Sequence, residues 1–252
     1  MATAGGTCIH CWSGPRCLST SLMYSWGNRS DCAVIDEPLY AHYLRVTGAS
    51  RPYRQEVLDS MEQDGDRVVA SSLLSPPEGK ALLYVKHIAK MRVGLQTHQQ
   101  ALMGSGKHFL LVRDPREMLN SWASVLPPSL HETCFPALIE VFSELRSLNG
   151  VPPPVIDAND IRRDPEGMIR SLCTHLGVTF TADMLSWEPG PRQWDGVWAP
   201  WWYKNTHSCS GFAPPLPAGD AKPLKEGLQE LYEECLPLYG MLTRRKLKAE
   251  VA

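Results

Sequence analysis

Short apolar runs alternate along the chain with longer segments of helical composition. Such runs are typical of buried strands, and they predict strands at residues 7–12, 32–35, 81–85, 108–112 and 155–158. The intervening segments predict helices at residues 18–26, 51–64, 134–149, 164–176 and 222–251, the last bent at Pro237. Strands that alternate with helices imply an α/β fold of three layers, a central parallel sheet with helices on both faces. No linker divides the chain, so we expect one domain over residues 1–252.

Composition and charge exclude several classes of function. Apolar residues make up 43% of the chain and charged residues 21%, which suits a globular enzyme. The formal net charge of -2 argues against general nucleic-acid binding and against adhesion to a membrane surface. No apolar run reaches transmembrane length, and the first predicted strand begins close to residue 1. We therefore expect a cytoplasmic protein without a membrane anchor.

The eight cysteines are scattered through predicted strands and helices. Cys8 and Cys11, with His10 between them, could suggest zinc, but no second pair of ligands follows at the spacing of a zinc finger. A strand also places Cys8 and Cys11 on opposite faces. We therefore expect buried, reduced thiols and no metal site.

The first strand leads into a segment suited to binding anions. Ser13-Gly14-Pro15 turns the chain, and the first turn of the next helix carries Ser19, Thr20 and Ser21. Backbone N–H groups at a helix start are free and carry the positive end of the helix dipole, and Arg16 adds a charge. The Gly-Lys pair of a Walker nucleotide loop is missing. An ordinary strand–turn–helix with hydroxyl caps explains this stretch equally well by itself.

A second anion motif follows the fourth predicted strand. That strand ends at Arg113, Asp114 caps a helix, Pro115 takes its first position, and Glu117 is placed to complete a capping box. Ser121 lies about two helical turns beyond Arg113, so a phosphate along the helix start could meet both side chains. Arginine suits this task because its planar guanidinium binds phosphate in a bidentate manner.

These two motifs together resemble those of the sulfotransferases that use 3′-phosphoadenylyl sulfate (PAPS). Their 5′-phosphosulfate loop runs Pro-[Lys/Arg]-Ser-Gly-[Ser/Thr]-[Ser/Thr], which Pro15, Arg16, Ser19 and Thr20 match, while Cys17 and Leu18 replace Ser-Gly. Arg113 and Ser121 match the 3′-phosphate motif. The resemblance implies a P-loop-like fold, PAPS as co-substrate and no metal. It implies a cofactor site made by the following residues: Ser13, Gly14, Arg16, Cys17, Leu18, Ser19, Thr20, Arg113 and Ser121.

The same resemblance provides two candidates for the general base. In one branch of the family a glutamate ends the second strand, as Glu37 does here, and in other members Lys-x-His follows the next strand. Here Lys86 and His87 are adjacent, so one of them must point away, and we favour Glu37. Arg16 would counter charge on the departing phosphate oxygen. Asp36-Glu37 also imitates a Walker B strand, which leaves a magnesium-dependent ATPase or phosphotransferase as an alternative.

The acceptor is the least constrained part of the prediction. A small cytosolic hydroxyl or amine metabolite is expected, or a carbon nucleophile such as 2-aminoacrylate, which would give cysteate. A non-catalytic PAPS-binding protein stays an alternative, and a homodimer is compatible with the sequence. Some short sulfotransferase-like proteins are labelled as branched-chain aminotransferase-like, but no feature of this sequence supports pyridoxal phosphate. Five tryptophans fall within residues 187–212, a segment that would form either a lid or packing over the sheet.

Overall fold

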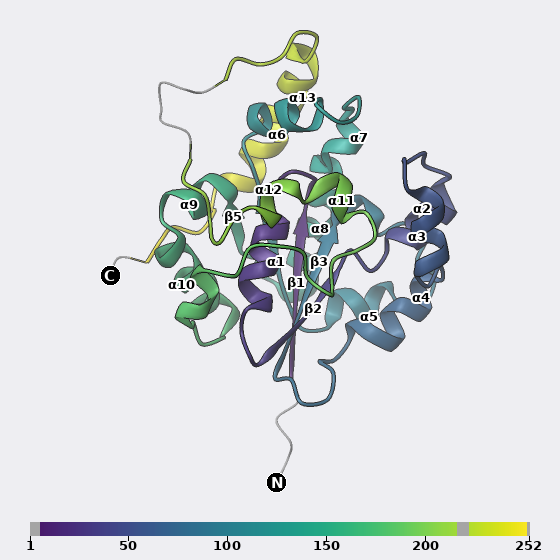
Figure 1. The fold of residues 1–252 in the computed structure, drawn as a ribbon, viewed down its shortest axis with the longest axis vertical. Coiled ribbons are helices and arrows are strands. Elements are labelled where there is room, and N and C mark those ends of the chain that lie inside the picture. The colour runs from purple at the N-terminus through teal and green to yellow at the C-terminus, as the bar shows by residue number, and fades with distance from the viewer. Residues whose placement is uncertain (1–5, 216–221, 251–252) are drawn as a thin grey trace.

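The computed structural model describes residues 6–215 and 222–250. Its centre is a five-stranded, fully parallel sheet in the order β2-β3-β1-β4-β5 (Figure 1). The strands are β1 (Thr7–Ser13), β2 (Cys32–Asp36), β3 (Leu82–Ile88), β4 (Lys107–Val112) and β5 (Val155–Asp157). They confirm the predicted α/β class and all five predicted strands, because a fully buried parallel strand leaves a short, continuous apolar run.

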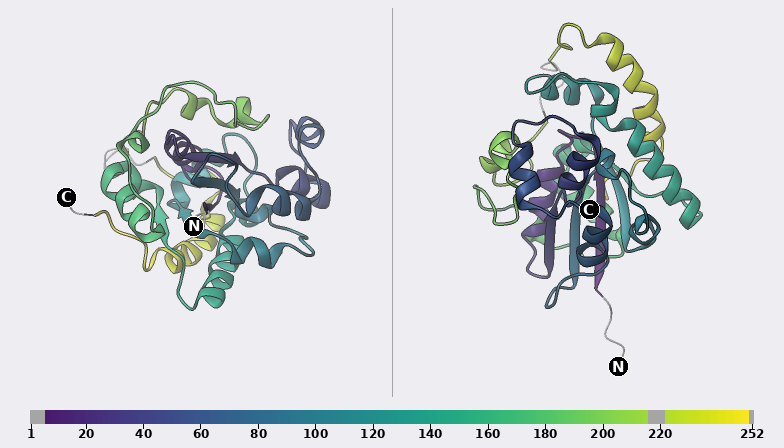
Figure 2. Two further views of the ribbon diagram at one scale, coloured as in Figure 1. Left: turned by 90° about the horizontal axis from the view of Figure 1, so that it is seen from below. Right: turned by 90° about the vertical axis from the view of Figure 1, so that its right-hand side faces the viewer.

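Helices cover both faces of this sheet (Figure 2). On one face α1 (Ser19–Gly27) packs on β2 and β3, and on the other α8 (Phe135–Asn149) packs on β1 and β4 beside α13 (Gln229–Thr243). The longer helices that complete the layers are α2 (Tyr40–Thr47), α3 (Arg54–Ser60), α5 (Gln99–Gly104), α6 (Pro115–Trp122), α9 (Ala158–Arg163) and α10 (Pro165–Leu176). Single turns form α4 (Gly65–Val68), α7 (Leu130–Thr133), α11 (Ala199–Trp202) and α12 (Lys204–His207).

The strand order creates a switch point between β1 and β4. From β1 the chain crosses through α1 towards β2, whereas from β4 it crosses through α8 towards β5, in the opposite direction. Right-handed crossovers in opposite directions place their helices on opposite faces. A crevice therefore opens at the carboxyl ends of β1 and β4, where ligands bind in open α/β sheets.

Several predicted boundaries are wrong. The helix expected over residues 51–64 is only α3, because Asp64 caps a new turn, α4, at Gly65. Lys86 and His87 lie within β3, not after it. Glu117 does not complete a capping box, since its carboxylate binds Arg113 and Asn159. The last helix, α13, runs through Pro237 but begins at Gln229 and ends at Thr243, so it is shorter at both ends than the predicted 222–251; residue 251 itself lies outside the described residues.

Residues 187–212 cross the carboxyl edge of the sheet, where α11 and α12 lie above the strand ends in Figure 1. Trp187 and Trp198 are buried, whereas Trp201 is exposed. Within the described part of the chain, no helix has the length and apolar character to cross a membrane.

Candidate active site

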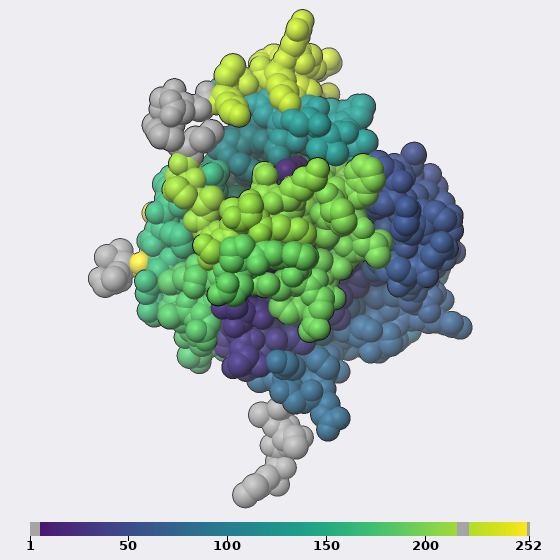
Figure 3. Space-filling view, in the orientation of Figure 1, coloured from purple at the N-terminus to yellow at the C-terminus, as the bar shows by residue number. Residues whose placement is uncertain are grey.

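A cleft of about 310 Å³ opens at the carboxyl edge of the sheet. Its lining comes from the segments that follow β1, β2 and β4, from β3 itself, and from α11 and α12. Figure 3 shows a recess between the green segment that holds α11 and α12 and the teal helices above it. The position agrees with the switch point of the sheet.

The loop after β1 forms one wall of the cleft. A Cβ atom on Gly14 would lie 2.5 Å from the carbonyl oxygen of Thr133, so only glycine fits there. Arg16 and Leu18 both have left-handed backbones, with φ of 61° and 70°. Leu18 gives α1 no side-chain cap, and the first helical bond runs from Leu22 N–H to Leu18 O. The N–H groups of the first turn therefore precede the helical bonding pattern, as an anion-binding helix start requires.

The polar side-chain atoms of two predicted members of this loop are bound to backbone carbonyls. The Ser13 hydroxyl donates a 3.3 Å hydrogen bond to the carbonyl of His87 in β3. The Cys17 thiol donates to the carbonyl of Pro15, and burial raises its pKa to about 12. Both side chains fix the turn, whereas Ser19 and Thr20 line the cleft itself.

The structure brings the two predicted anion motifs together. Arg16 Nε donates a 2.9 Å hydrogen bond to Ser121 Oγ of α6. Arg113 Nη1 donates a 2.9 Å bond to the carbonyl of Arg16. These contacts join residues 105 and 97 positions apart in the sequence. The switch point explains them, because the motifs follow the neighbouring strands β1 and β4.

A third arginine, which the sequence did not suggest, completes this basic wall. Arg162 of α9 lines the cleft with Arg16 and Arg113. Glu117 binds Arg113 at 2.6 Å and lies 3.6 Å from Arg162. Burial, and then the charge of Arg113, lower the pKa of both Arg16 and Arg162. Mutual repulsion among guanidinium groups favours an anion from outside the chain.

Where β2 and β3 reach the cleft, a lysine and two carboxyl side chains meet. Lys86 of β3 lies beside Asp36 of β2 in the strand register, and its Nζ is 2.8 Å from Asp36 Oδ1. The same ammonium binds Glu37 Oε1 at 2.7 Å and the hydroxyl of Tyr203. The Tyr203 hydroxyl in turn donates to Asp36 Oδ2 at 2.7 Å. Neighbouring parallel strands whose side chains share a face produce this arrangement directly.

Burial and charge change the ionisation of this group. Burial raises the pKa of Glu37, Lys86 opposes that shift, and Asp36 adds to it. Burial disfavours the Lys86 ammonium, but Asp36 and Glu37 outweigh it and raise the pKa of Lys86. The result is a charged lysine beside a carboxylate that accepts protons more readily than an ordinary glutamate.

Comparison with known proteins identifies the family. A family model described as "Sulfotransferase domain" matches residues 7–246. The chain belongs to this sulfotransferase family. The sulfotransferase domain of the Synechococcus PCC 7002 olefin synthase has a similar fold, with a TM-score of 0.56, 15% identity and coverage of 94% of this chain and 97% of that one. A sulfotransferase from Alicyclobacillus acidocaldarius gives a TM-score of 0.54 at 12% identity, covering 97% and 98%.

A curated relative is closer in sequence but much longer. "Branched-chain-amino-acid aminotransferase-like protein 2" from Arabidopsis thaliana is 46% identical over 235 residues, which are 93% of this chain. The chain spans only 41% of the length of that relative. Its name therefore describes a longer protein.

His87 lies on the other face of β3 from Lys86, because successive side chains of a strand alternate. Its ring stacks on Trp12 at 4.0 Å between centroids, and its Nε2 lies 3.0 Å from His10 Nδ1. His87 is 2% exposed, and burial lowers the pKa of its imidazole well below the ordinary value. The structure thus places Glu37 and Lys86 at the cleft and His87 in the core.

The tryptophan-rich segment, residues 187–212, both packs into the core and lines the cleft. Trp198 is 2% exposed, and its indole N–H donates a 2.9 Å bond to the Tyr203 hydroxyl. Trp202 stacks on Trp122 at 5.3 Å, and its carbonyl accepts a 3.1 Å bond from Arg16. The segment thereby connects the loop after β1 with the residues around Glu37.

Proposed function

We propose that this sulfotransferase transfers the sulfuryl group of PAPS to a small acceptor. The observation that carries this proposal is the meeting of Arg16 with Ser121 and of Arg113 with the Arg16 carbonyl. A nucleotide with phosphate groups at two positions needs two basic sites that share one cleft. Two motifs at the carboxyl ends of neighbouring strands supply them.

The residues present fit such a nucleotide. The N–H groups of Ser19 and Thr20, with Arg16, would hold the 5′-phosphosulfate at the start of α1. Arg113, Ser121 and Arg162 would hold the 3′-phosphate. Within the described residues, Glu117 is the one carboxylate paired with these three guanidinium groups, which favours an added negative charge.

Catalysis would rest on positioning, charge stabilisation and one proton transfer. When bound, PAPS supplies an activated sulfuryl group, whose bond to a 5′-phosphate oxygen breaks as the bond to the acceptor forms. Glu37 takes the proton of the acceptor, and Lys86 fixes the direction of the Glu37 carboxylate. Arg16 and the start of α1 stabilise the charge on the departing phosphate oxygen.

The acceptor we propose is a small hydroxyl or amine metabolite, or a carbon nucleophile such as 2-aminoacrylate, which would yield cysteate. A cleft of about 310 Å³ supports a small molecule. A cytoplasmic location stays a prediction.

The test is a transfer assay with ³⁵S-labelled PAPS and a fractionated metabolite extract. We expect a labelled product whose formation needs neither magnesium nor ATP. Magnesium-dependent ATP turnover without sulfuryl transfer would contradict the proposal and indicate an ATPase or phosphotransferase. Binding of PAPS without any labelled product, across all fractions, would leave a non-catalytic binding protein.

A further inference from the structure

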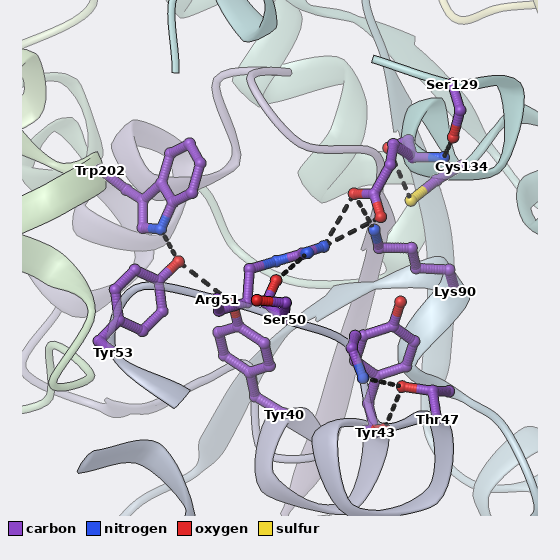
Figure 4. Close-up of polar contacts among 12 residues, drawn as sticks. Tyr40, Tyr43, Thr47, Ser50, Arg51, Tyr53, Lys90, Ser129, Cys134 and Trp202 are labelled. Atoms are coloured by element: carbon purple, nitrogen blue, oxygen red, sulfur yellow. Dashed lines mark hydrogen bonds and ion pairs between the residues drawn. The ribbon is translucent and has the colours of Figure 1, made fainter. Parts of the chain in front are cut away.

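A second buried group of charges lies at the cleft, on the side away from Arg113. Arg51 Nη2 binds both oxygens of Glu132, at 2.9 and 3.0 Å, and Lys90 Nζ binds the same carboxylate (Figure 4). The side chains of Arg51 and Lys90 are only 10% and 3% exposed. Both residues line the cleft, to which none of the sequence motifs assigned them.

The charges of this group do not balance. Two cations share one carboxylate, so the group of Arg51, Lys90 and Glu132 carries a net positive charge. Lys90 has three N–H donors, and Glu132 is the carboxylate it contacts. A buried cation without full compensation is costly, and it is tolerated where a ligand supplies the missing anion. The adjoining group of Asp36, Glu37 and Lys86 carries the opposite net charge, so this positive excess is local, and it fits a carboxylate better than a phosphate dianion.

An unpartnered donor belongs to another residue of the cleft lining. The indole nitrogen of Trp122 is buried and has no hydrogen-bond partner within the described part of the chain. Trp122 lines the cleft, and Lys90 Nζ lies 5.9 Å from the centre of its ring. Buried indole N–H groups normally find an acceptor, which a ligand carboxylate could provide.

The group around Lys86 and the group around Glu132 carry opposite net charges, so one end of the acceptor side of the cleft is negative and the other positive. Around Lys86 two carboxylates share one cation, whereas around Glu132 two cations share one carboxylate. The groups are neighbours, since the charge of Lys90 acts on Glu37. A small molecule whose carboxylate binds Lys90 would thus direct a proton-bearing nucleophile towards Glu37.

We propose that Arg51 and Lys90 bind a carboxylate of the acceptor, so that the sulfotransferase acts on small carboxylic acids. This inference rests on the function proposed above. The aromatic hydroxyls of Tyr40 and Tyr53, 3.2 Å apart, and the indole of Trp202 bound to Tyr53 form the adjacent wall (Figure 4). They limit the space beyond the carboxylate and favour a short molecule.

The first step of the test separates this inference from the function itself. Calorimetric titration with PAP, the desulfated nucleotide, should show tight binding to the wild type and to Lys90→Met alike. If the wild type does not bind PAP, the proposed function is wrong. Intact PAP binding makes the next step a test of the acceptor alone.

The second step uses L-lactate and L-lactamide as probes, with saturating PAP and saturation-transfer NMR. The two differ only in the carboxylate, so lactate should bind at least about tenfold more tightly, as expected for charge-assisted hydrogen bonds to buried cations. Lys90→Met should remove that preference, since it leaves a balanced Arg51–Glu132 pair. Glu132→Gln should strengthen lactate binding, because it removes the competing carboxylate.

Arg54→Gln is the matched control. Arg54 is a neighbouring cation whose Nη2 donates to the Leu44 carbonyl instead of lining the cleft, so lactate binding should not change. Equal binding of lactate and lactamide, failure of lactate to bind, or lactate binding unchanged by Lys90→Met would each overturn the inference.

Discussion

Glu37 is one of four non-glycine residues with a positive φ within the described part of the chain, at 45°. Arg16 and Leu18 are two others, and all three line the cleft. Backbone strain of this kind persists where the surrounding structure fixes it, often at functional sites. At Glu37 the Lys86 ammonium holds the side chain in place.

Glu37→Gln should lower turnover by roughly two to four orders of magnitude, which is typical for loss of a general base. The amide keeps the size of the side chain and can still contact Lys86, so PAP binding should stay unchanged. Steady-state rates with PAPS, together with calorimetry of PAP, measure the two effects. Full turnover by Glu37→Gln would exclude Glu37 as the base.

The pH profile gives an independent measure of the same residue. Because burial raises the pKa of Glu37 above its ordinary 4.5, turnover should fall as the pH drops through that raised value. Turnover should be constant above it, where the carboxylate is ionised. In Glu37→Gln the residual rate should lack this acidic limb, and an unchanged limb would assign it to another group.

For single residues, the sequence ranked the candidates for the general base but did not show where their side chains lie. Strand alternation required Lys86 and His87 to point to opposite faces, and the register of β3 with β2 decided which one meets Glu37. The left-handed conformation of Leu18, where the family motif has glycine, was not readable because leucine rarely adopts it.

Among the elements, the loop from β1 to α1 is the most constrained. Gly14→Ala should destabilise the protein by about 1–3 kcal/mol, because its Cβ would overlap the Thr133 carbonyl, a backbone atom. PAP binding should weaken as the loop shifts. Gly240→Ala in α13 is the control: nothing lies within 4 Å of its Cβ, so it should be neutral or stabilising by about 0.5–1 kcal/mol. Urea unfolding measures both, and equal effects would contradict this account.

Strands β1, β3 and β4 also share a buried histidine cluster of His10, His87 and His108. His10 stacks on His108 at 4.7 Å between centroids, and Arg92 and Glu144 are the charged groups beside His108. Burial lowers the pKa of His108 to about 4, from an ordinary 6.5. The unfolded chain therefore binds more protons, so folding stability is complete above pH 6.5 and is lost as the pH falls towards 4.

Between pH 7 and pH 5, His108 alone should cost about 2 kcal/mol of unfolding free energy. His10 and His87 shift in the same direction and should add to that loss. Denaturant unfolding at both pH values measures it. His108→Gln should reduce the pH-dependent loss, whereas His131→Gln, at an exposed position, should not. A loss that His108→Gln leaves unaltered would contradict the role of this cluster.

Prediction of elements succeeded where apolar runs or caps were strong. All five strands were predicted, as were α1, α8 and α10, the last ended by Gly177 in a left-handed conformation. Helices α2 and α5 were missed, since α2 carries polar His42 and Arg45 and α5 has only six residues. Tertiary packing, not local propensity, stabilises helices this short.

In the whole molecule, the switch point of the sheet determines where the site lies. It places the predicted motifs together because they follow β1 and β4, and the order of strands and helices in the sequence implied a shared edge. Arg162, and the group of Arg51, Lys90 and Glu132, could not be predicted. Their contacts join loops and helices whose approach depends on the complete packing of the chain, as in the pair of Arg51 with Glu132, 81 positions apart.

We expect the cleft to recognise a nucleotide that carries a 3′-phosphate. Calorimetry of PAP against 5′-AMP tests it most directly, with Arg113→Ala as the variant and Arg116→Ala, at an exposed position of α6, as the control. We predict that the wild type and Arg116→Ala prefer PAP by at least about tenfold and that Arg113→Ala loses the preference. Equal affinity of the wild type for PAP and 5′-AMP would contradict the account.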